Sequence, residues 1–178
     1  ELNTTYLNSL DSTSKSMIRN TKYYLGGKNL IWNNEYVDTP LQFYSYERKK
    51  QNTTSYEFYY ESNPNNWVGK LGLMYLSDYG YASSNCENKK IWDNNSSSND
   101  IRACNGTNWL FKGNAEWLLP QNTRSSSLAF LVDAHGKVDY NDFVKYVQYA
   151  VRPVLYLISS VQITEGDGTS SNPYILGL

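Results

Sequence analysis

The chain has few of the residues that most catalytic sites and metal centres require. Its 178 residues include one histidine and two cysteines. That is too few for the common nucleophile–base pairs or for a zinc site with His and Cys ligands. We therefore expect no enzyme activity, no metal ion and no cofactor. His135, beside Gly136, is expected to be an ordinary turn residue.

Charge and long apolar runs are also scarce. Charged residues make up 19% of the chain, and 16 Lys and Arg nearly balance 17 Asp and Glu. This balance provides no basic surface for nucleic acid, so nucleic acid is not an expected partner. No apolar run reaches the roughly 20 residues of a membrane-spanning helix, and no basic signal-peptide region precedes Glu1. We expect no membrane span, and either a matured product or a trimmed anchor.

Aromatic residues are abundant instead. The chain holds 17 Tyr and 5 Trp, separated by clusters of Asn and Ser. Tyr provides rigid amphipathic contact area and small polar residues provide adaptable hydrogen bonds, a combination typical of binding surfaces. A hydrophobic content of 40% over this length supports one core. The composition favours a single domain over residues 1–178 that binds a ligand outside the cell.

The apolar pattern changes along the chain. Near-helical spacing predicts a helix within residues 7–25, capped by Ser9 or Asp11 and ended by the glycines at 26 and 27. Short alternating runs rich in Tyr, Val, Ile and Phe then predict strands at 41–46, 56–60, 70–76, 128–133 and 151–158. A hairpin at 134–136 would make the sheet at least partly antiparallel.

The longest polar segment, residues 83–108, contains both cysteines. Cys86 and Cys104 lie near its ends, so a disulfide would close this loop and stabilise the fold by roughly 3 kcal/mol. Such a bond indicates an oxidising compartment. Two reduced, buried thiols in a cytosolic protein remain the alternative. The Asp and Asn oxygens of residues 93–100 match no EF-hand loop.

A series of motifs covers nearly the whole chain. They are YLNSL at 6–10, YLGG at 24–27, WVGKLGLMYLSDYGYA at 67–82, NWLF at 108–111, WLLP at 117–120, YAVRPVLYL at 149–157, GDGT at 166–169 and NPY at 172–174. In this order they resemble a C-type-lectin-like module found in surface and pilin-like proteins of gut Firmicutes. That group is distantly similar to formylglycine-generating enzymes and to the variable proteins of diversity-generating retroelements. The resemblance implies an α+β fold, with an N-terminal helix against a small twisted antiparallel sheet and long irregular binding loops.

Two departures from the wider family limit what the resemblance implies. The formylglycine-generating enzymes use a cysteine pair near a C-terminal arginine motif, whereas no cysteine follows Cys104 here. The calcium signatures Glu-Pro-Asn and Trp-Asn-Asp are absent as well. We therefore expect a non-catalytic, cell-surface-attached adhesin or receptor head that recognises a glycan or a surface protein of a host or another bacterium. A structural head of a pilin or surface filament, or an enzyme of the formylglycine-generating kind, remains the alternative.

The resemblance places the ligand-binding face before the Val-Arg-Pro strand. The segment there is dense in Tyr and broken by polar residues, and Tyr rings with Asn amides can stack on and hydrogen-bond a sugar. The expected contact residues are Trp117, Tyr140, Asn141, Tyr146 and Tyr149. Packing of this stretch against the sheet remains the alternative, because strand alternation turns at least one Tyr inward.

Arg152 is expected to be structural. It lies in the apolar run 151–158, where an ion must be paired, and Asp78 or Asp133 is the expected partner.

Overall fold

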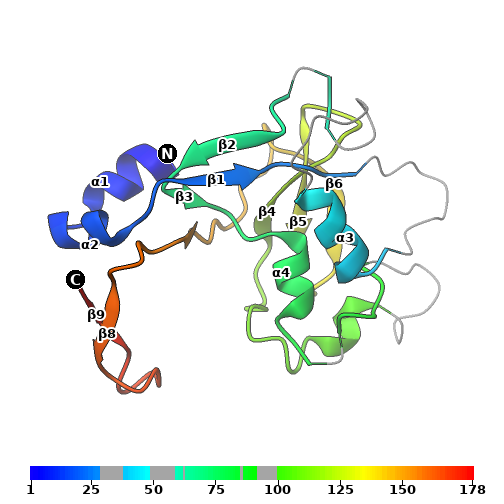
Figure 1. The fold of residues 1–178 in the computed structure, drawn as a ribbon. Helices are drawn as coiled ribbons and strands as arrows, with labels where there is room; N and C mark the ends of the chain where they lie inside the picture. The colour runs from blue at the N-terminus through cyan, green and yellow to red at the C-terminus, as the bar shows by residue number, and fades with distance from the viewer. Residues whose placement is uncertain (29–37, 49–58, 62, 85, 92–99) are drawn as a thin grey trace. The chain divides into compact units, whose positions relative to one another are not determined.

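The computed structural model describes residues 1–28, 38–48, 59–61, 63–84, 86–91 and 100–178. They form helices and small sheets with antiparallel pairing, so the chain has the expected α+β class (Figure 1). Contacts divide the chain into two compact units. Unit 1 comprises Glu1–Lys22, Val68–Gly72 and Val154–Leu178, and unit 2 comprises Tyr23–Trp67 and Leu73–Pro153. The single domain over residues 1–178 stays a prediction.

Unit 1 combines the two ends of the chain. Its elements are the π-helix η1 (Leu2–Tyr6), α1 (Leu7–Ser9), α2 (Ser12–Met17), β3 (Leu71–Gly72), β7 (Val154–Leu155), β8 (Gln162–Glu165) and β9 (Ile175–Gly177). β3 pairs with β7, and β8 pairs with β9. The Asn3 side chain accepts hydrogen bonds from the N–H groups of Lys70 and Leu71, both at 3.0 Å, and so ties η1 to β3.

The predicted helix over 7–25 is wrong in extent. Asp11 does cap α2, accepting a 2.9 Å hydrogen bond from Ser14 N. However, Leu10 and Ile18 are extended, and the chain forms β1 (Thr21–Tyr24) beyond them. The side chains of Ser9 and Ser16 donate to the backbone carbonyls three residues earlier, and such bonds compete with a continuous helix.

The glycines at 26 and 27 do not end a helix. They follow β1, where a Cβ on Gly26 would lie 2.1 Å from the carbonyl oxygen of Tyr46, and one on Gly27 would lie 1.7 Å from that of Gln121. Both positions therefore require glycine for close backbone approach. β1 pairs with β2 (Asn66–Gly69), and the division between the units falls within both strands.

The described part of unit 2 packs two helices beside a three-stranded sheet (Figure 1). Its remaining elements are α3 (Pro40–Glu47), α4 (Leu76–Tyr81), the 3-10 helix η2 (Ile101–Cys104), β4 (Glu116–Gln121), β5 (Leu128–Val132) and β6 (Val138–Phe143). Phe43 of α3 contacts Phe130 of β5 edge-on, with ring centroids 5.2 Å apart. The buried Tyr79 of α4 donates a 3.2 Å hydrogen bond to the carbonyl of Gly136.

Several strand predictions need correction. Residues 41–46 belong to α3, where Thr39 and Gln42 form a capping box and Pro40 occupies the first turn. Within 70–76 only β3 is a strand, and α4 begins at Leu76. Within 151–158 the strand is β7 alone, with an isolated bridge at Leu157. Residues 56–58 of the predicted strand 56–60 lie outside the described residues.

The hairpin prediction is confirmed. β5 and β6 pair antiparallel around residues 133–137, and Gly136 has a φ of +79°, the left-handed conformation that favours glycine. The Oδ1 atom of Asp133 accepts hydrogen bonds from the N–H groups of His135 and Lys137. His135 is an exposed turn residue, as expected.

Candidate ligand-binding surface

The sheet of unit 2 brings two of the predicted contact residues together. Trp117 of β4 donates its backbone N–H to the carbonyl of Ala150 at 3.1 Å, and Ala150 donates to Ala115 at 2.9 Å. This pairing places Tyr149 beside Trp117, with ring centroids 5.0 Å apart and ring planes 57° apart. Both side chains are half-buried, so each has one part packed and another open to solvent.

The turn after β6 exposes a second aromatic pair. Tyr146 is 74% exposed and Phe143 is 49% exposed, and their ring centroids are 6.0 Å apart. The carbonyl of Phe143 accepts the N–H groups of Tyr146 at 3.0 Å and Val147 at 3.3 Å, while Val144 donates to Ser127. The ammonium of Lys145 lies 5.5 Å from the centroid of the Tyr146 ring. The exposed rings thus stand on a hydrogen-bonded turn.

The side chains of the other two predicted contact residues are not described by the structure. Tyr140 and Asn141 belong to β6, but their side chains lie outside the described residues. Phe143 was missed by sequence reasoning. Its signal was an apolar residue directly after the polar pair at 141–142, where alternation alone would allow either face.

Arg152 pairs with a different carboxylate from the two expected. It donates 2.5 Å to Glu116 Oε1 and 2.9 Å to the carbonyl of Leu110. Neither Asp78 nor Asp133 is the partner, because Ala150 forms a parallel bridge with Glu116, and Arg152, two residues further along the chain, reaches back to the Glu116 carboxylate. Arg152 also precedes β7 instead of lying within a strand.

Asp78 has a structural role elsewhere. Its Oδ2 atom accepts the N–H of Tyr75 at 3.1 Å, and its Oδ1 atom accepts from Arg48 at 3.3 Å. The Arg48 guanidinium also lies over the Tyr75 ring, 4.0 Å from the centroid. These contacts join the start of α4 to the end of α3.

The predicted disulfide is confirmed. Cys86 and Cys104 are bonded, with Cα atoms 6.3 Å apart.

Asp100, which follows the undescribed residues 92–99, accepts a 2.9 Å hydrogen bond from Arg102 N and pairs with the Arg102 guanidinium. Its carboxylate therefore caps η2. Among the described residues no group of three or more His, Cys, Asp or Glu side chains could hold a metal ion.

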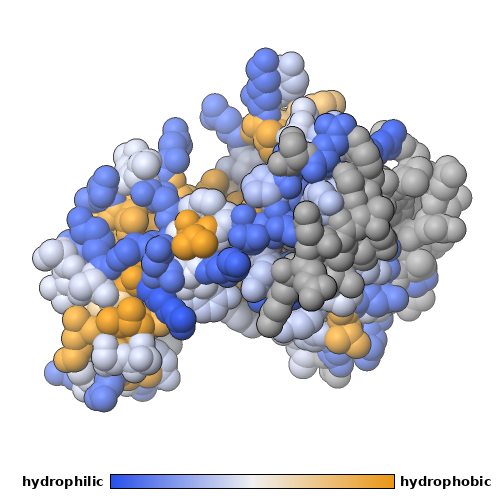
Figure 2. All heavy atoms as spheres, turned by 45° about the horizontal axis from the view of Figure 1, so that its top comes forward, coloured by the Kyte–Doolittle hydropathy of each residue, from blue (hydrophilic) through white to orange (hydrophobic). Residues whose placement is uncertain are grey.

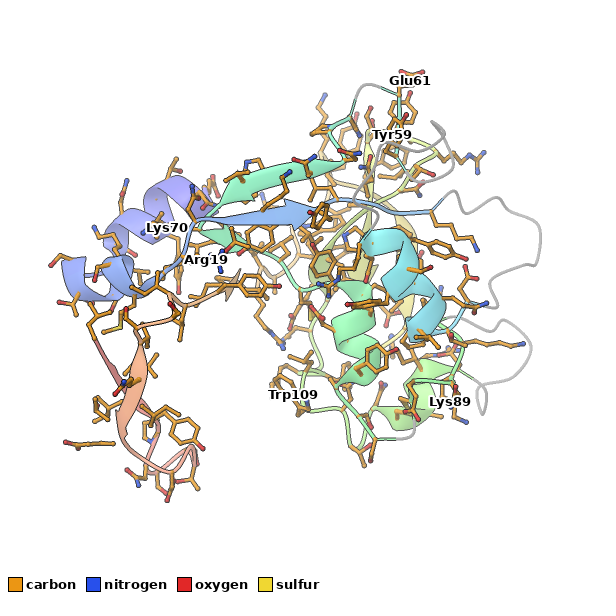
Figure 3. The ribbon with its side chains drawn as sticks, viewed as in Figure 1. Arg19, Tyr59, Glu61, Lys70, Lys89 and Trp109 are labelled. Atoms are coloured by element: carbon orange, nitrogen blue, oxygen red, sulfur yellow. A yellow bond between two sulfur atoms is a disulfide. The ribbon has the colours of Figure 1, made fainter. Side chains whose placement is uncertain are left out.

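Two further features escaped sequence reasoning. Trp109 is 67% exposed on the loop that follows η2 (Figure 3), although its N–H is held by the carbonyl of Ala82.

Glu47 is fully buried and accepts hydrogen bonds from Ser77 N, at 3.1 Å, and from Ser77 Oγ. Burial raises the pKa of Glu47 to about 8 despite the Ser77 hydrogen bonds that lower it. Helical spacing from Phe43 to Glu47 could have located it, had that segment been recognised as a helix.

Comparisons with protein-family models, with curated proteins and with solved structures find no match to this chain. In the described part of the chain, no helix has the length and apolar character needed to cross a membrane.

Proposed function

We propose that the chain is an extracellular, non-catalytic binding module of C-type-lectin-like fold. It captures a glycan or a surface protein through an aromatic surface, defined here as Trp117, Phe143, Tyr146 and Tyr149. The observation that carries this proposal is the 74% exposure of Tyr146 on a turn fixed by backbone hydrogen bonds.

The energetics of this turn support binding. Exposed aromatic rings gain free energy when a ligand removes them from water, roughly 25 cal/mol for each Å² of apolar area. A loop whose backbone is already ordered loses less entropy on binding. The turn supplies both conditions, because Phe143 and Tyr146 are exposed while the Phe143 carbonyl holds the backbone of Tyr146 and Val147.

The Trp117–Tyr149 pair has a rigid support. The Trp117 backbone is bonded to Ala150, and the adjacent Arg152–Glu116 pair fastens the same chain segment to β4. The pair can therefore act as a fixed wall against which a sugar ring or an aromatic side chain stacks. The Cys86–Cys104 disulfide and the motif resemblance both favour an extracellular setting.

A structural head of a pilin or filament is the second candidate. Unit 1 favours it, because apolar side chains of the β8–β9 hairpin, Ile163 and Ile175, are exposed, as is Leu178 directly after β9. Exposed apolar surface of this kind marks assembly contacts in many proteins. Concentration-dependent self-association of the isolated chain would favour this candidate.

The test of the binding proposal uses capture on glycan and surface-protein arrays. Tyr146→Ser should abolish capture of the ligand that the unaltered chain retains, and its thermal melt should be unchanged. Tyr81→Ser is the matched control, because Tyr81 is also exposed, at 46%, but lies on α4 outside the aromatic surface. Equal loss of capture in both variants, or in neither, would contradict the proposal.

A further inference from the structure

Unit 1 contains a pocket of about 440 Å³. Every residue of this unit lies in the described part of the chain. The walls of the pocket are mainly aliphatic and include Leu10, Met17, Ile18, Leu155, Leu157 and Leu176. They come from the N-terminal helices, the β7 segment and β9, so the site exists only when the two ends of the chain meet.

Backbone pairing holds these walls in place. Ile18 and Leu157 form an antiparallel bridge, and Ile158 donates its N–H to the carbonyl of Met17 at 2.9 Å. Asp11 caps α2 directly after the extended Leu10, so the helix start and the adjacent wall are fixed together. The pocket is therefore a preformed feature of unit 1.

The aliphatic walls are incompletely covered. Leu155, Leu157 and Leu176 remain 38%, 39% and 38% exposed. Apolar side chains also gather on the surface of unit 1 in the space-filling view (Figure 2). A ligand with an aliphatic part would bury these leucines and gain the corresponding transfer free energy.

The polar side of the pocket carries one charge. Thr13, Ser14 and Asp11 line it, and of its described lining residues Asp11 alone is ionisable to an anion near neutral pH. The Oδ1 and Oδ2 atoms of Asp11 accept hydrogen bonds from Ser14 N and Ser14 Oγ, at 2.9 and 2.6 Å. These bonds lower the pKa of the Asp11 carboxyl, so it remains a carboxylate. Each oxygen retains capacity to accept a further hydrogen bond.

We propose that this pocket binds a small amphipathic organic cation, whose aliphatic part contacts the leucine walls and whose ammonium group pairs with the carboxylate of Asp11. The volume lies within the roughly 300–1,000 Å³ of small-molecule sites. The charge selects against an anionic ligand such as a fatty acid. The proposal is independent of the aromatic surface, because that surface belongs to unit 2.

The two methionines of the chain provide the measurement. Met17 lines the pocket, whereas Met74 is buried in unit 2 and serves as an internal control. With isotope-labelled methionine methyl groups, the intact chain is titrated with octylammonium, octanol or octanoate below micelle-forming concentrations. Met17→Leu assigns the two signals. Octylammonium should shift the Met17 signal saturably, leave Met74 unchanged and bind about threefold tighter than octanol, because the Asp11 carboxylate is exposed to solvent, with octanoate weakest.

Two variants separate charge from shape. Asp11→Asn keeps an equally good helix cap but removes the charge, so octylammonium should bind about as weakly as octanol. Thr13→Phe introduces a ring at the pocket wall and should reduce binding of all three probes. A thermal melt of each variant confirms that it is folded.

Three results would overturn the proposal: no saturable Met17 shift, equal affinity for the three probes, or an unchanged preference for octylammonium in Asp11→Asn. Parallel shifts of Met17 and Met74 would indicate general detergent action and would overturn it as well.

Discussion

Arg152 and Glu116 form a hydrogen-bonded ion pair at 2.5 Å that fastens the segment before β7 to the first residue of β4. The Glu116 side chain is only 8% exposed, and its Oε2 atom has no hydrogen-bond partner within the described residues. Removing the arginine would therefore leave a carboxylate buried without its counter-charge.

Arg152→Ala should lower the free energy of unfolding by about 3 kcal/mol, because a stranded buried charge costs more than a lost surface pair. Lys137→Ala, which breaks the more exposed Lys137–Asp139 pair, is the control and should cost less than about 1 kcal/mol. Urea unfolding of both variants measures the difference. Equal costs would contradict the role assigned to Arg152.

The buried Glu47 should make stability depend on pH. Its pKa is about 8 in the folded chain against 4.5 for the free group, so the folded state holds the proton more tightly. This contribution is fully present below about pH 4.5 and is lost as the pH rises toward 8, amounting to a few kcal/mol. Nearby Asp78 raises the pKa and Arg48 lowers it, but burial has the largest effect.

Glu47→Gln tests this dependence. The glutamine carbonyl can still accept from Ser77 N, and its amide can donate to Ser77 Oγ. Urea unfolding at about pH 5 and about pH 8 should show a smaller difference for the variant than for the unaltered chain. An identical difference would assign the pH dependence to other groups.

The Cys86–Cys104 disulfide should persist in protein from its native source. Alkylation after denaturation without reductant should label neither cysteine. Replacing both cysteines with serine should lower the free energy of unfolding by roughly 3 kcal/mol, since the bond closes a loop with a sequence separation of 18. Labelling of both cysteines would contradict the exported setting together with the bond.

Gly27→Ala should destabilise unit 2 by more than about 2 kcal/mol, because the new methyl group would overlap the backbone oxygen of Gln121 and the chain must shift. Gly106→Ala is the matched control, since a Cβ there meets nothing within 4 Å. Thermal melting compares the two variants. Similar melting temperatures would show that Gly27 is not a close-approach position.

Local signals in the sequence predicted several features correctly. Gly136 between two alternating runs marked the β5–β6 hairpin, Asp11 marked a helix cap, and the two cysteines marked the disulfide. The hairpin and the helix cap depend on residues that are close in sequence. The disulfide could be predicted because two cysteines allow only one pairing. The α+β class, which the resemblance implied, agrees with the helices and small antiparallel sheets of the structure.

The sequence did not predict helix α3 or the partner of Arg152. Phe43 and its tyrosine neighbours favour a strand by propensity, but the capping box of Thr39 and Gln42 starts a helix there. A strand over 41–46 does not predict the burial of Glu47, which follows from its place in α3. The partner of Arg152 depends on which residue lies opposite Ala150. That residue is Glu116, 34 positions earlier in the chain, and no local sequence pattern predicts a pairing over this separation.

The dissociation constant of the captured ligand for the double variant Phe143→Ser with Tyr146→Ser tests the central claim most directly. If the aromatic surface binds the ligand, affinity should fall by about a thousandfold, since two anchoring aromatic residues at about 2 kcal/mol each contribute about 4 kcal/mol, while Tm stays unchanged. An unchanged dissociation constant in a folded variant would place the ligand elsewhere. A collapsed melt would show that these rings belong to the core, and either result would contradict the account.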